Sequence, residues 1–273
     1  MFWKLSALFA AIALAACATP RPHYEPTIQA QLERPRGGVR LNTFHCLNGA
    51  CPVGAPAGNA LIVREIYALS TNGETKFADW VAYVVTPQTV GRSQSRNWAA
   101  DPWLDPNETL QPGDYDGANA ALGTDRGHQA PLAAFSGTDH WRDTNYLSNI
   151  TPQMAPLNQG PWEHLESRER ALAEAGARVY VLTGPLYERD MPSLPEAQST
   201  PHRIPSGYWK VVIAGNGAAA TAFIMEQDTP RGAHYCAHIV AIDEVERRSG
   251  LRLLPRVQRA LGAFDADLGC ASN

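Results

Sequence analysis

The sequence has no excess of positive charge. Its 23 Lys and Arg residues stand against 27 Asp and Glu residues, which gives a formal net charge of −4 at pH 7. Proteins that hold nucleic acid or acidic membranes by bulk charge need many basic side chains facing phosphates, so this composition excludes that mode of binding. If phosphate is the target, the cations that contact it must be few and local.

The sequence also lacks internal repeats and low-complexity blocks. Of its 273 residues, 44% are hydrophobic and 18% are charged, a balance that excludes disorder as the main state. A chain of this length can bury the full core of one large globular domain. We therefore expect a single folded domain behind any targeting segment.

The apolar run at the N-terminus is too short to cross a bilayer as an anchor. Residues 1–17, MFWKLSALFAAIALAAC, carry an early positive residue, Lys4, and small residues before Cys17. This pattern predicts a signal peptide. Its end resembles the bacterial lipobox, in which the cysteine is lipidated and becomes the new N-terminus; ordinary signal cleavage beside an incidental cysteine is the alternative.

Residues 18–38 are rich in proline and polar residues and have no periodicity. They suit a flexible tether between a membrane anchor and a folded domain at 39–273. Ala18 follows the lipobox cysteine in place of the aspartate that often retains lipoproteins at the inner membrane. For a Gram-negative host, this predicts an outer-membrane lipoprotein facing the periplasm or the cell surface.

No CxxC pair is present among the remaining cysteines, which are Cys46, Cys51, Cys236 and Cys270. In an exported protein these are expected to form disulfides. Four cysteines allow three pairings. The short loop with Asn48-Gly49 favours a bridge between Cys46 and Cys51. Cys236 and Cys270 would then form the second bridge, which would attach the C-terminal tail to the domain. The alternative is a zinc site that combines these cysteines with His234 or His238.

Regular elements predict an α+β fold with a central, mainly antiparallel sheet and flanking helices. Two strand-forming runs, NALIVREIYALS and FADWVAYVVTP, flank Thr71-Asn72-Gly73 and should pair as a hairpin. Three later runs also read as strands, namely ARVYVLTGPLY, YWKVVIAG and TAFIMEQ. Helices are expected from Pro161 to Ala175, where charges lie off an apolar stripe, and near Ile242 to Ser249, with alternating outer charges.

One stretch, GTDRGHQAPLAAF at 123–135, suits neither a core strand nor an ordinary solvent loop. Downstream, asparagines recur at Asn145, Asn149 and Asn158, the last just ahead of the predicted helix. A segment bearing His128, a return segment and that helix would form a ββα arrangement with imidazole and amide on opposite walls of a cleft. Glu166 follows Asn158 by about two helical turns, offset by about 80°, so it could face the same cleft.

Four motifs, TDRGHQAPLAAF, NYLSNITPQ, LNQGPWEHLE and RSQSRNWAADP, together resemble the DNA/RNA non-specific endonuclease family of Serratia-type, ββα-metal or His-Me finger nucleases. The resemblance runs from about Cys46 to Cys270. It implies an exported, Mg²⁺-dependent endonuclease, with Mn²⁺ as an alternative metal, that hydrolyses DNA and RNA. It also allows a homodimer, and the N-terminal lipid would add a membrane contact.

The resemblance implies a role for each matching residue. His128 corresponds to the general base; an unperturbed histidine pKa near 6.5 leaves much of it neutral at pH 7. Asn158 corresponds to the single protein ligand of Mg²⁺, an ion that often keeps several waters. Metal-bound water would be oriented by Glu166, and the pentacovalent phosphate neutralised by Arg96.

Five further residues match positions around the family's site: Asp125, Arg126, Asn149, Gln153 and Arg170. Arg126 would offer a cation, Asp125 would anchor the turn by hydrogen bonding, and Gly127 would let backbone and substrate approach closely. Arg170 is expected to pair with Glu166 one turn earlier.

Each candidate also has a structural interpretation. His128 could be a satisfied core histidine, Asn149 an Asx turn, Asn158 a helix cap and Glu166 a solvated carboxylate, while Arg96 could be a surface charge. Five of the seven tryptophans, at positions 80, 98, 103, 141 and 162, could be base-stacking platforms but are expected to fill core space. Alternative functions are an inactive relative that binds nucleic acid or a partner, a structural surface lipoprotein, and a phosphodiesterase confined to one kind of nucleic acid.

Overall fold

The computed structural model describes residues 41–92, 94–257 and 261–270 of the chain. The predicted signal peptide, its lipidation site Cys17, the tether and the first two residues of the predicted domain lie outside these described residues. Within the described part, no helix combines the length and apolar character needed to cross a membrane.

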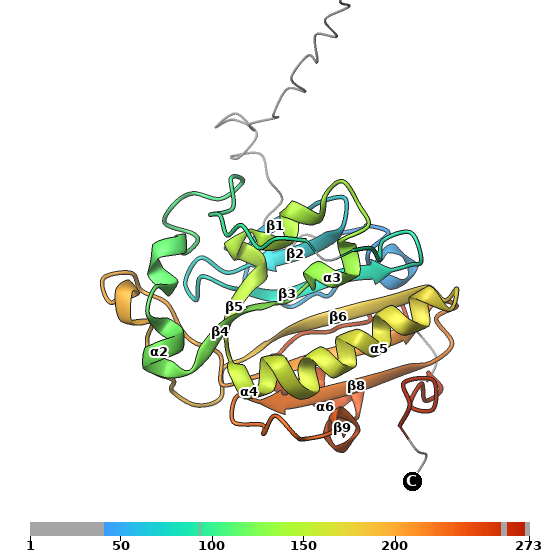
Figure 1. Cartoon of the computed structure of the whole chain (residues 1–273). Coiled ribbons are helices and arrows are strands. Elements are labelled where there is room, and N and C mark those ends of the chain that lie inside the picture. The colour runs from blue at the N-terminus through green and yellow to red at the C-terminus, as the bar shows by residue number, and fades with distance from the viewer. Residues whose placement is uncertain (1–40, 93, 258–260, 271–273) are drawn as a thin grey trace, which may run out of the picture.

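A seven-stranded sheet forms the centre of the molecule (Figure 1). Its spatial order is β1-β2-β3-β6-β7-β8-β9, and every neighbouring pair is antiparallel. The strands are β1 (Ala60–Val63), β2 (Tyr67–Thr71), β3 (Ala78–Val85), β6 (Val179–Leu186), β7 (Gly207–Ala214), β8 (Ala220–Glu226) and β9 (Ile239–Val240). The predicted α+β class with a mainly antiparallel sheet is confirmed.

Beside this sheet stands a separate two-stranded ribbon of β4 (Thr124–His128) and β5 (Ile150–Met154). Short helices surround the ribbon and lead into the long helix α5: α2 (Ala118–Leu122), α3 (Leu132–Phe135) and α4 (Ala155–Leu157). Single 3₁₀ turns complete the described chain at Leu47–Gly49, Pro112–Tyr115, Trp141–Asn145, Leu147–Asn149, Pro195–Ala197 and Tyr235–His238. Ribbon and helix together form the expected ββα unit.

The first predicted strand run differs from expectation, because it folds as two strands. The chain reverses between β1 and β2, where the Arg64 amide donates to the Tyr67 carbonyl at 2.8 Å. The Arg64 side chain is buried at this turn and lies 2.6 Å from Asp101 Oδ1. This ion pair compensates for burying a charged turn residue, and β2 then pairs with β3 as predicted.

Two apolar cores lie on opposite faces of the sheet. Along β7, Tyr208 and Val212 belong to the core under α5 (Glu163–Glu174), whereas Trp209 and Val211 belong to the core under α6 (Ile242–Ser249). This alternation follows from the two-residue period of a strand. The molecule is therefore layered as helix, sheet and helix, with α5 across one face (Figure 1).

The helix predicted from Pro161 to Ala175 is confirmed as α5, but its approach is not α-helical. A π-helical turn, Asn158–Trp162, precedes it, with Gly160 at φ −121° and ψ −118°. A Cβ on Gly160 would lie 2.5 Å from the Arg231 carbonyl oxygen, so only glycine permits this contact. The wide turn presents Asn158 ahead of the regular helix.

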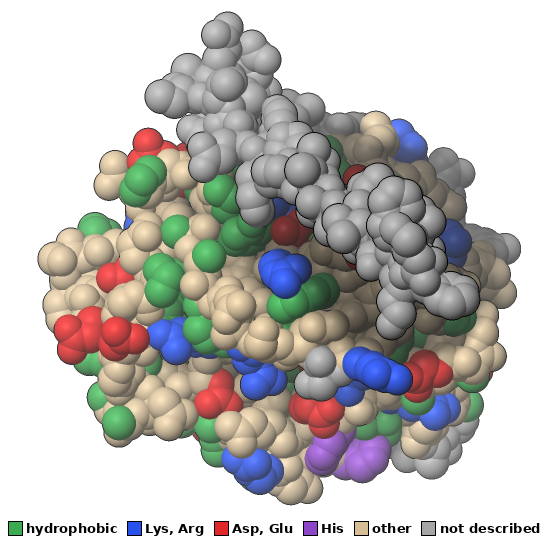
Figure 2. All heavy atoms as spheres, turned by 45° about the horizontal axis from the view of Figure 1, so that its top comes forward, with side chains coloured by type: hydrophobic (Ala, Val, Ile, Leu, Met, Phe, Trp, Pro, Cys, Tyr) green, Lys and Arg blue, Asp and Glu red, His purple; other side chains and the backbone are tan. Residues whose placement is uncertain are grey.

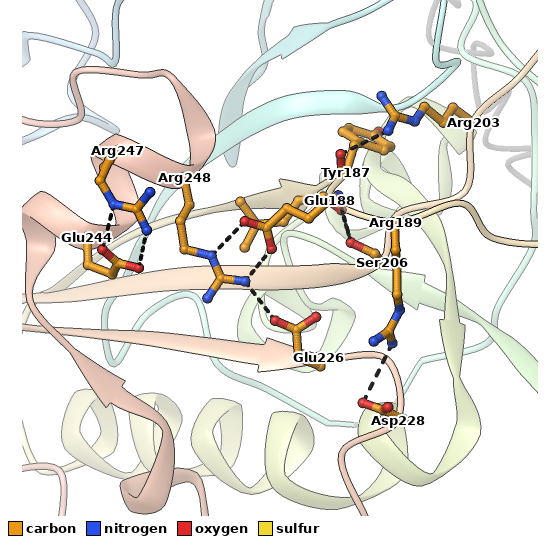
Figure 3. A network of polar contacts seen from close by, with 11 residues as sticks. Tyr187, Glu188, Arg189, Arg203, Ser206, Glu226, Asp228, Glu244, Arg247 and Arg248 are labelled. Atoms are coloured by element: carbon orange, nitrogen blue, oxygen red, sulfur yellow. Dashed lines mark hydrogen bonds and ion pairs between the residues drawn. The ribbon is translucent and has the colours of Figure 1, made fainter.

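The predicted helix near Ile242 is also confirmed, and its charges attach it to the sheet (Figure 3). Arg247 Nη2 lies 2.7 Å from Glu244 Oε1 on the outer surface. Arg248 instead reaches inward, where it donates to Glu188 at 2.8 Å and to Glu226 of β8 at 2.7 Å. The bridging arginine thus joins α6 to β8 and to the loop that follows β6.

Both predicted disulfides are present, Cys46–Cys51 and Cys236–Cys270. The zinc alternative is wrong, because all four of these sulfur atoms are in bridges and none is left as a thiolate ligand. The second bridge joins the 3₁₀ turn after β8 to the last described residue. It therefore holds the C-terminal segment against the core.

Removing the two bridges should destabilise the protein unequally. Their sequence separations are 34 and 5 residues, and a cross-link over a longer loop removes more entropy from the unfolded chain. We expect a loss of about 4 kcal/mol for Cys236→Ser/Cys270→Ser and about 2 kcal/mol for Cys46→Ser/Cys51→Ser. Urea unfolding of both variants beside wild type measures this, and a larger loss from the short loop would contradict it.

Candidate active site

The two-stranded ribbon carries the GTDRGHQAPLAAF motif along one edge of a cleft. Across β4 and β5, His128 pairs with Ile150 and Asp125 with Gln153. A Cβ on Gly127 would lie 2.6 Å from Gln153 Oε1 and 2.7 Å from Gln153 Cβ. Gly127 thus permits a close approach, as predicted, but the group that approaches its Cβ position is the buried Gln153 side chain.

The cleft has a volume of about 560 Å³ and lies between the ribbon and the start of α5. Seven of the predicted site residues line it: Arg96, Asp125, Arg126, His128, Asn158, Glu166 and Arg170. The other two, Asn149 and Gln153, are buried behind the lining. The lining residues thus come from three of the four sequence motifs and from Arg170 further along α5.

His128 sits in the cleft with one ring nitrogen occupied. Its Nε2 lies 3.2 Å from Asn145 Oδ1, and the Trp98 ring packs at 5.2 Å between centroids. An amide oxygen only accepts hydrogen bonds, so Nε2 carries the hydrogen and Nδ1 keeps the lone pair. Burial lowers the pKa of His128 to about 4, although the hydrogen bond to Asn145 acts in the opposite direction, and the Arg96 charge lowers it further. The ring is therefore neutral at pH 7.

The partner of this ring, Asn145, is a functional candidate to which the sequence motifs alone assign no role. It ends the 3₁₀ turn Trp141–Asn145, its side chain is buried, and its backbone oxygen accepts from the Ala99 amide at 3.3 Å. The sequence feature that could have identified Asn145 is its position as the first residue of NYLSNITPQ, one of the four motifs. Only the fold shows that Asn145, and not Asn149, faces the imidazole.

Asn149 holds the backbone that follows His128. Its side-chain nitrogen donates to the carbonyls of Ala130 and Thr144, both at 2.9 Å, and its side-chain oxygen accepts from the Ala130 amide at 2.8 Å. The residue is fully buried. With its polar groups used inside the protein, Asn149 clamps the two segments that carry His128 and Asn145.

Asn158 and Asp125 connect the helix approach to the ribbon. Asn158 Nδ2 donates to Asp125 Oδ2 at 2.9 Å, and Gln159 Nε2 donates to the same oxygen at 2.7 Å. Asn119 Nδ2 adds a bond to Asp125 Oδ1 at 3.1 Å. Asp125 thus anchors three neighbouring side chains. The contact uses the amide nitrogen of Asn158, so the amide oxygen is left for the cleft, and the side chain does not cap a helix.

Glu166 faces the cleft as its helical offset from Asn158 predicted, but it is not a solvated carboxylate. It is 8% exposed and lies 3.4 Å from Lys210 Nζ. Burial raises the pKa of Glu166 to about 7, while the nearby Lys210 ammonium acts in the opposite direction. Its charge at neutral pH therefore depends on the cations around it.

The predicted ion pair between Arg170 and Glu166 is wrong. Arg170 Nη2 lies 3.0 Å from Glu163 Oε1, two turns earlier on α5, and donates to Ser167 at 2.7 Å. Glu166 turns toward the sheet instead, because Lys210 of β7 supplies its cation. Arg170 remains at the cleft wall, where its charge adds to that of the other arginines.

Two arginines bring positive charge to the other side of the cleft. Arg126 donates to the Pro112 carbonyl at 3.0 Å and stacks between Trp98 and Tyr115, at 5.8 and 5.3 Å from the ring centroids. Arg96 is exposed at the cleft edge. On the face that Figure 2 shows, basic side chains are scattered among acidic and uncharged ones.

The donors in the cleft fit a Mg²⁺ ion. Asn158 offers a free amide oxygen, and Glu163 and Glu166 line the same space. Among the described residues, no group of three or more His, Cys, Asp or Glu side chains is placed to hold a metal. An ion bound through the Asn158 oxygen could keep most of its waters, as Mg²⁺ does because it sheds them reluctantly.

Known proteins resemble this chain over most of its length. The Nuclease of Serratia marcescens is 52% identical over 209 residues, which cover 74% of this chain and 78% of that protein. The mitochondrial Endonuclease G of Bos taurus is 31% identical over 228 residues, covering 78% and 75%.

A similar fold occurs in the solved structure described as the crystal structure of the EndoG/EndoGI complex. The TM-score is 0.62 at 24% identity, and the match covers 74% of this chain and 89% of that one. The sequence profile of DNA/RNA non-specific endonucleases matches residues 48–260. The chain therefore belongs to the DNA/RNA non-specific endonuclease family of enzymes.

Proposed function

We propose that this protein is a Mg²⁺-dependent endonuclease that hydrolyses phosphodiester bonds of both DNA and RNA, with His128 as its general base. The observation that carries the proposal is the imidazole of His128, oriented by Asn145 in a cleft that is also lined by Asn158 and three arginines. Membership of the endonuclease family supports the reaction class.

The hydrogen bond to Asn145 would orient the His128 imidazole and fix its tautomer for its role as the base. Since Nε2 is committed to the amide oxygen, Nδ1 is the atom that would take a proton from the attacking water. A base must be neutral to accept a proton, and the lowered pKa of His128 keeps it neutral throughout the physiological range. Asn149 fixes the backbone on either side of this pair.

Asn158 and Glu166 would serve the metal. Asn158 would bind it through the amide oxygen that the contact with Asp125 leaves free. Glu166 would accept hydrogen bonds from the water shell, and this orients the ion without direct ligation. When bound, Mg²⁺, or Mn²⁺ in its place, would stabilise negative charge on the phosphate and on the departing 3′ oxygen.

Arg96 and Arg126 would contact the phosphate. Arg96 would neutralise the pentacovalent phosphate, because a guanidinium matches two phosphate oxygens at once. Arg126 is held by aromatic rings and would add charge from a fixed position. Contacts limited to the backbone carry no base information, which supports action on many sequences by a protein of net charge −4.

The protein acts outside the cytoplasm. The signal-peptide pattern of residues 1–17 and the two disulfides support export, because disulfides persist in oxidising compartments. The lipobox-like sequence that ends at Cys17 supports anchoring at the outer membrane, facing the periplasm or the cell surface.

Cleavage should require both the metal and the base. With the chain from residue 41 onward and Mg²⁺, we expect nicking of supercoiled plasmid and degradation of total RNA, both abolished by EDTA. His128→Ala and Asn158→Ala should each lower the rate by at least ~100-fold, since general-base catalysis alone contributes about that much. Gel electrophoresis of the two substrates measures this. Cleavage that survives in His128→Ala would contradict the assigned base.

Replacing Asn145 by aspartate should move the pH profile. A carboxylate beside Nε2 favours the imidazolium, so the pKa of His128 rises and the base is protonated at higher pH than in wild type. We expect the acidic limb of kcat/KM, measured from pH 5 to 9 at saturating Mg²⁺, to shift upward by about 1 to 2 units.

The matched variant Asn145→Ala removes the hydrogen bond without adding charge. It should lower kcat by about tenfold or more without displacing the limb upward. Coincident profiles for wild type and Asn145→Asp would show that this residue does not contact the titrating base.

A further inference from the structure

Lys210 lies in the middle of a core-facing row of β7. Tyr208 and Val212, two positions before and after it, belong to the apolar core under α5. Residues two apart on a strand share a face, and Lys210 is 0% exposed. Burying an ammonium costs free energy that an apolar side chain at this position would not cost, so packing alone does not account for this residue.

The Lys210 ammonium is held between α5 and the sheet. Its Nζ lies 3.1 Å from Glu169 Oε1, 3.4 Å from Glu166 Oε1 and 4.4 Å from the centroid of the Trp162 ring. On the far side, Tyr83 of β3 donates its hydroxyl to Glu169 Oε2 at 3.0 Å. Lys210 is therefore held by two carboxylates of α5, one of which is itself fixed by Tyr83, and it lies beside the carboxylate that lines the cleft.

The two glutamates differ in what they face. The Glu169 side chain is 0% exposed, whereas the Glu166 side chain is 11% exposed and borders the cleft. Three charged groups act on Glu166: Lys210 from β7, and Glu169 and Arg170 from its own helix. Arg170 makes its ion pair with Glu163, so Lys210 is the cation in contact with Glu166.

We propose that Lys210 is a positioning residue for the nuclease reaction, which keeps the Glu166 carboxylate charged and fixed toward the cleft so that it can order the water around a divalent cation. This inference rests on the proposed function. Glu169 and Tyr83 act one step further away, because they hold Lys210 under Glu166. Helix α5 is thus connected to β7 of the central sheet by the buried ion pairs of Lys210 with Glu166 and Glu169.

Lys210→Met tests the proposal, because methionine keeps the length of the side chain and removes its charge. Three readouts apply: urea stability, kcat and KM on plasmid DNA over a Mg²⁺ titration, and binding of Mn²⁺ followed by the EPR signal of the free ion. We expect kcat to fall and the Kd for Mn²⁺ to rise, each by about tenfold or more, with KM for DNA little changed.

Lys76→Met is the matched control. Lys76 is also buried, outside the cleft lining, where its ammonium donates to the carbonyl oxygens of Gly73 and Asn107. Its replacement should lower stability without changing kcat or Mn²⁺ binding. An equal loss of both in Lys76→Met would overturn the proposal, since the effect would then belong to any buried lysine.

Two double variants separate positioning from charge balance. In Glu166→Gln, adding Lys210→Met should have almost no further effect on kcat, because both changes remove one interaction. Adding Glu169→Gln to Lys210→Met removes the carboxylate that would be left buried without its cation, which protects folding, yet kcat should stay low. Additive losses in the first pair, or recovery in the second, would overturn the role of Lys210.

Failure of the nuclease assignment remains distinguishable. If wild type cleaves neither DNA nor RNA, the proposed function is wrong, whereas the Mn²⁺ titration still reports on Lys210. Weaker Mn²⁺ binding in Lys210→Met but not in Lys76→Met would then support the positioning role, and unchanged binding would refute it.

Discussion

The Asp125 carboxylate is the interaction on which the geometry of the site depends. It lies on β4, three residues before His128, and accepts hydrogen bonds from the side chains of Asn158 and Gln159 at the approach to α5. β5 continues directly into the approach to α5, whereas β4 contacts that approach through this carboxylate. A charged acceptor with two short bonds therefore sets the relative position of the imidazole wall and the amide wall.

The orientation of His128 depends on a second set of contacts that begins at the edge of the sheet. Arg64, in the turn after β1, lies 2.6 Å from Asp101 and 3.8 Å from Asp143, and its guanidinium stacks on Trp103 and Tyr146. These contacts hold the 3₁₀ segment that ends at Asn145. A buried arginine with several partners is rigid. The position of Asn145, and with it the geometry of its hydrogen bond to His128, is therefore fixed relative to the sheet.

Much of the fold was predictable because its signals are local. Strand alternation located β6, β7 and β8, the apolar stripe located α5, and cysteine spacing located both disulfides. The remaining features depend on contacts that are distant in sequence. Periodicity alone assigned the α5 charges to solvent, whereas Glu169 is buried because β7 places Lys210 opposite it.

The site was predictable to a similar extent. The motifs identified the residues that line the cleft, but not their partners, since Arg170 bonds to Glu163 and Gly127 accommodates Gln153. Asn145 illustrates the limit: three asparagines in one region are chemically equivalent until the backbone places one of them against the imidazole. Residue type and spacing define the candidates, and tertiary packing assigns their roles.

The close contact at Gly160 means that the loop after β8 helps to position the turn that carries Asn158. The Arg231 backbone rests where any side chain on Gly160 would lie, and the Arg231 guanidinium donates to Gln159 at 2.8 Å. Asn158 lies two residues before Gly160. A displacement of this loop would therefore move the Asn158 side-chain amide, although the loop itself does not line the cleft. Substitutions or insertions in this loop, which is distant in sequence, are therefore expected to shift Asn158, the residue proposed to bind the metal.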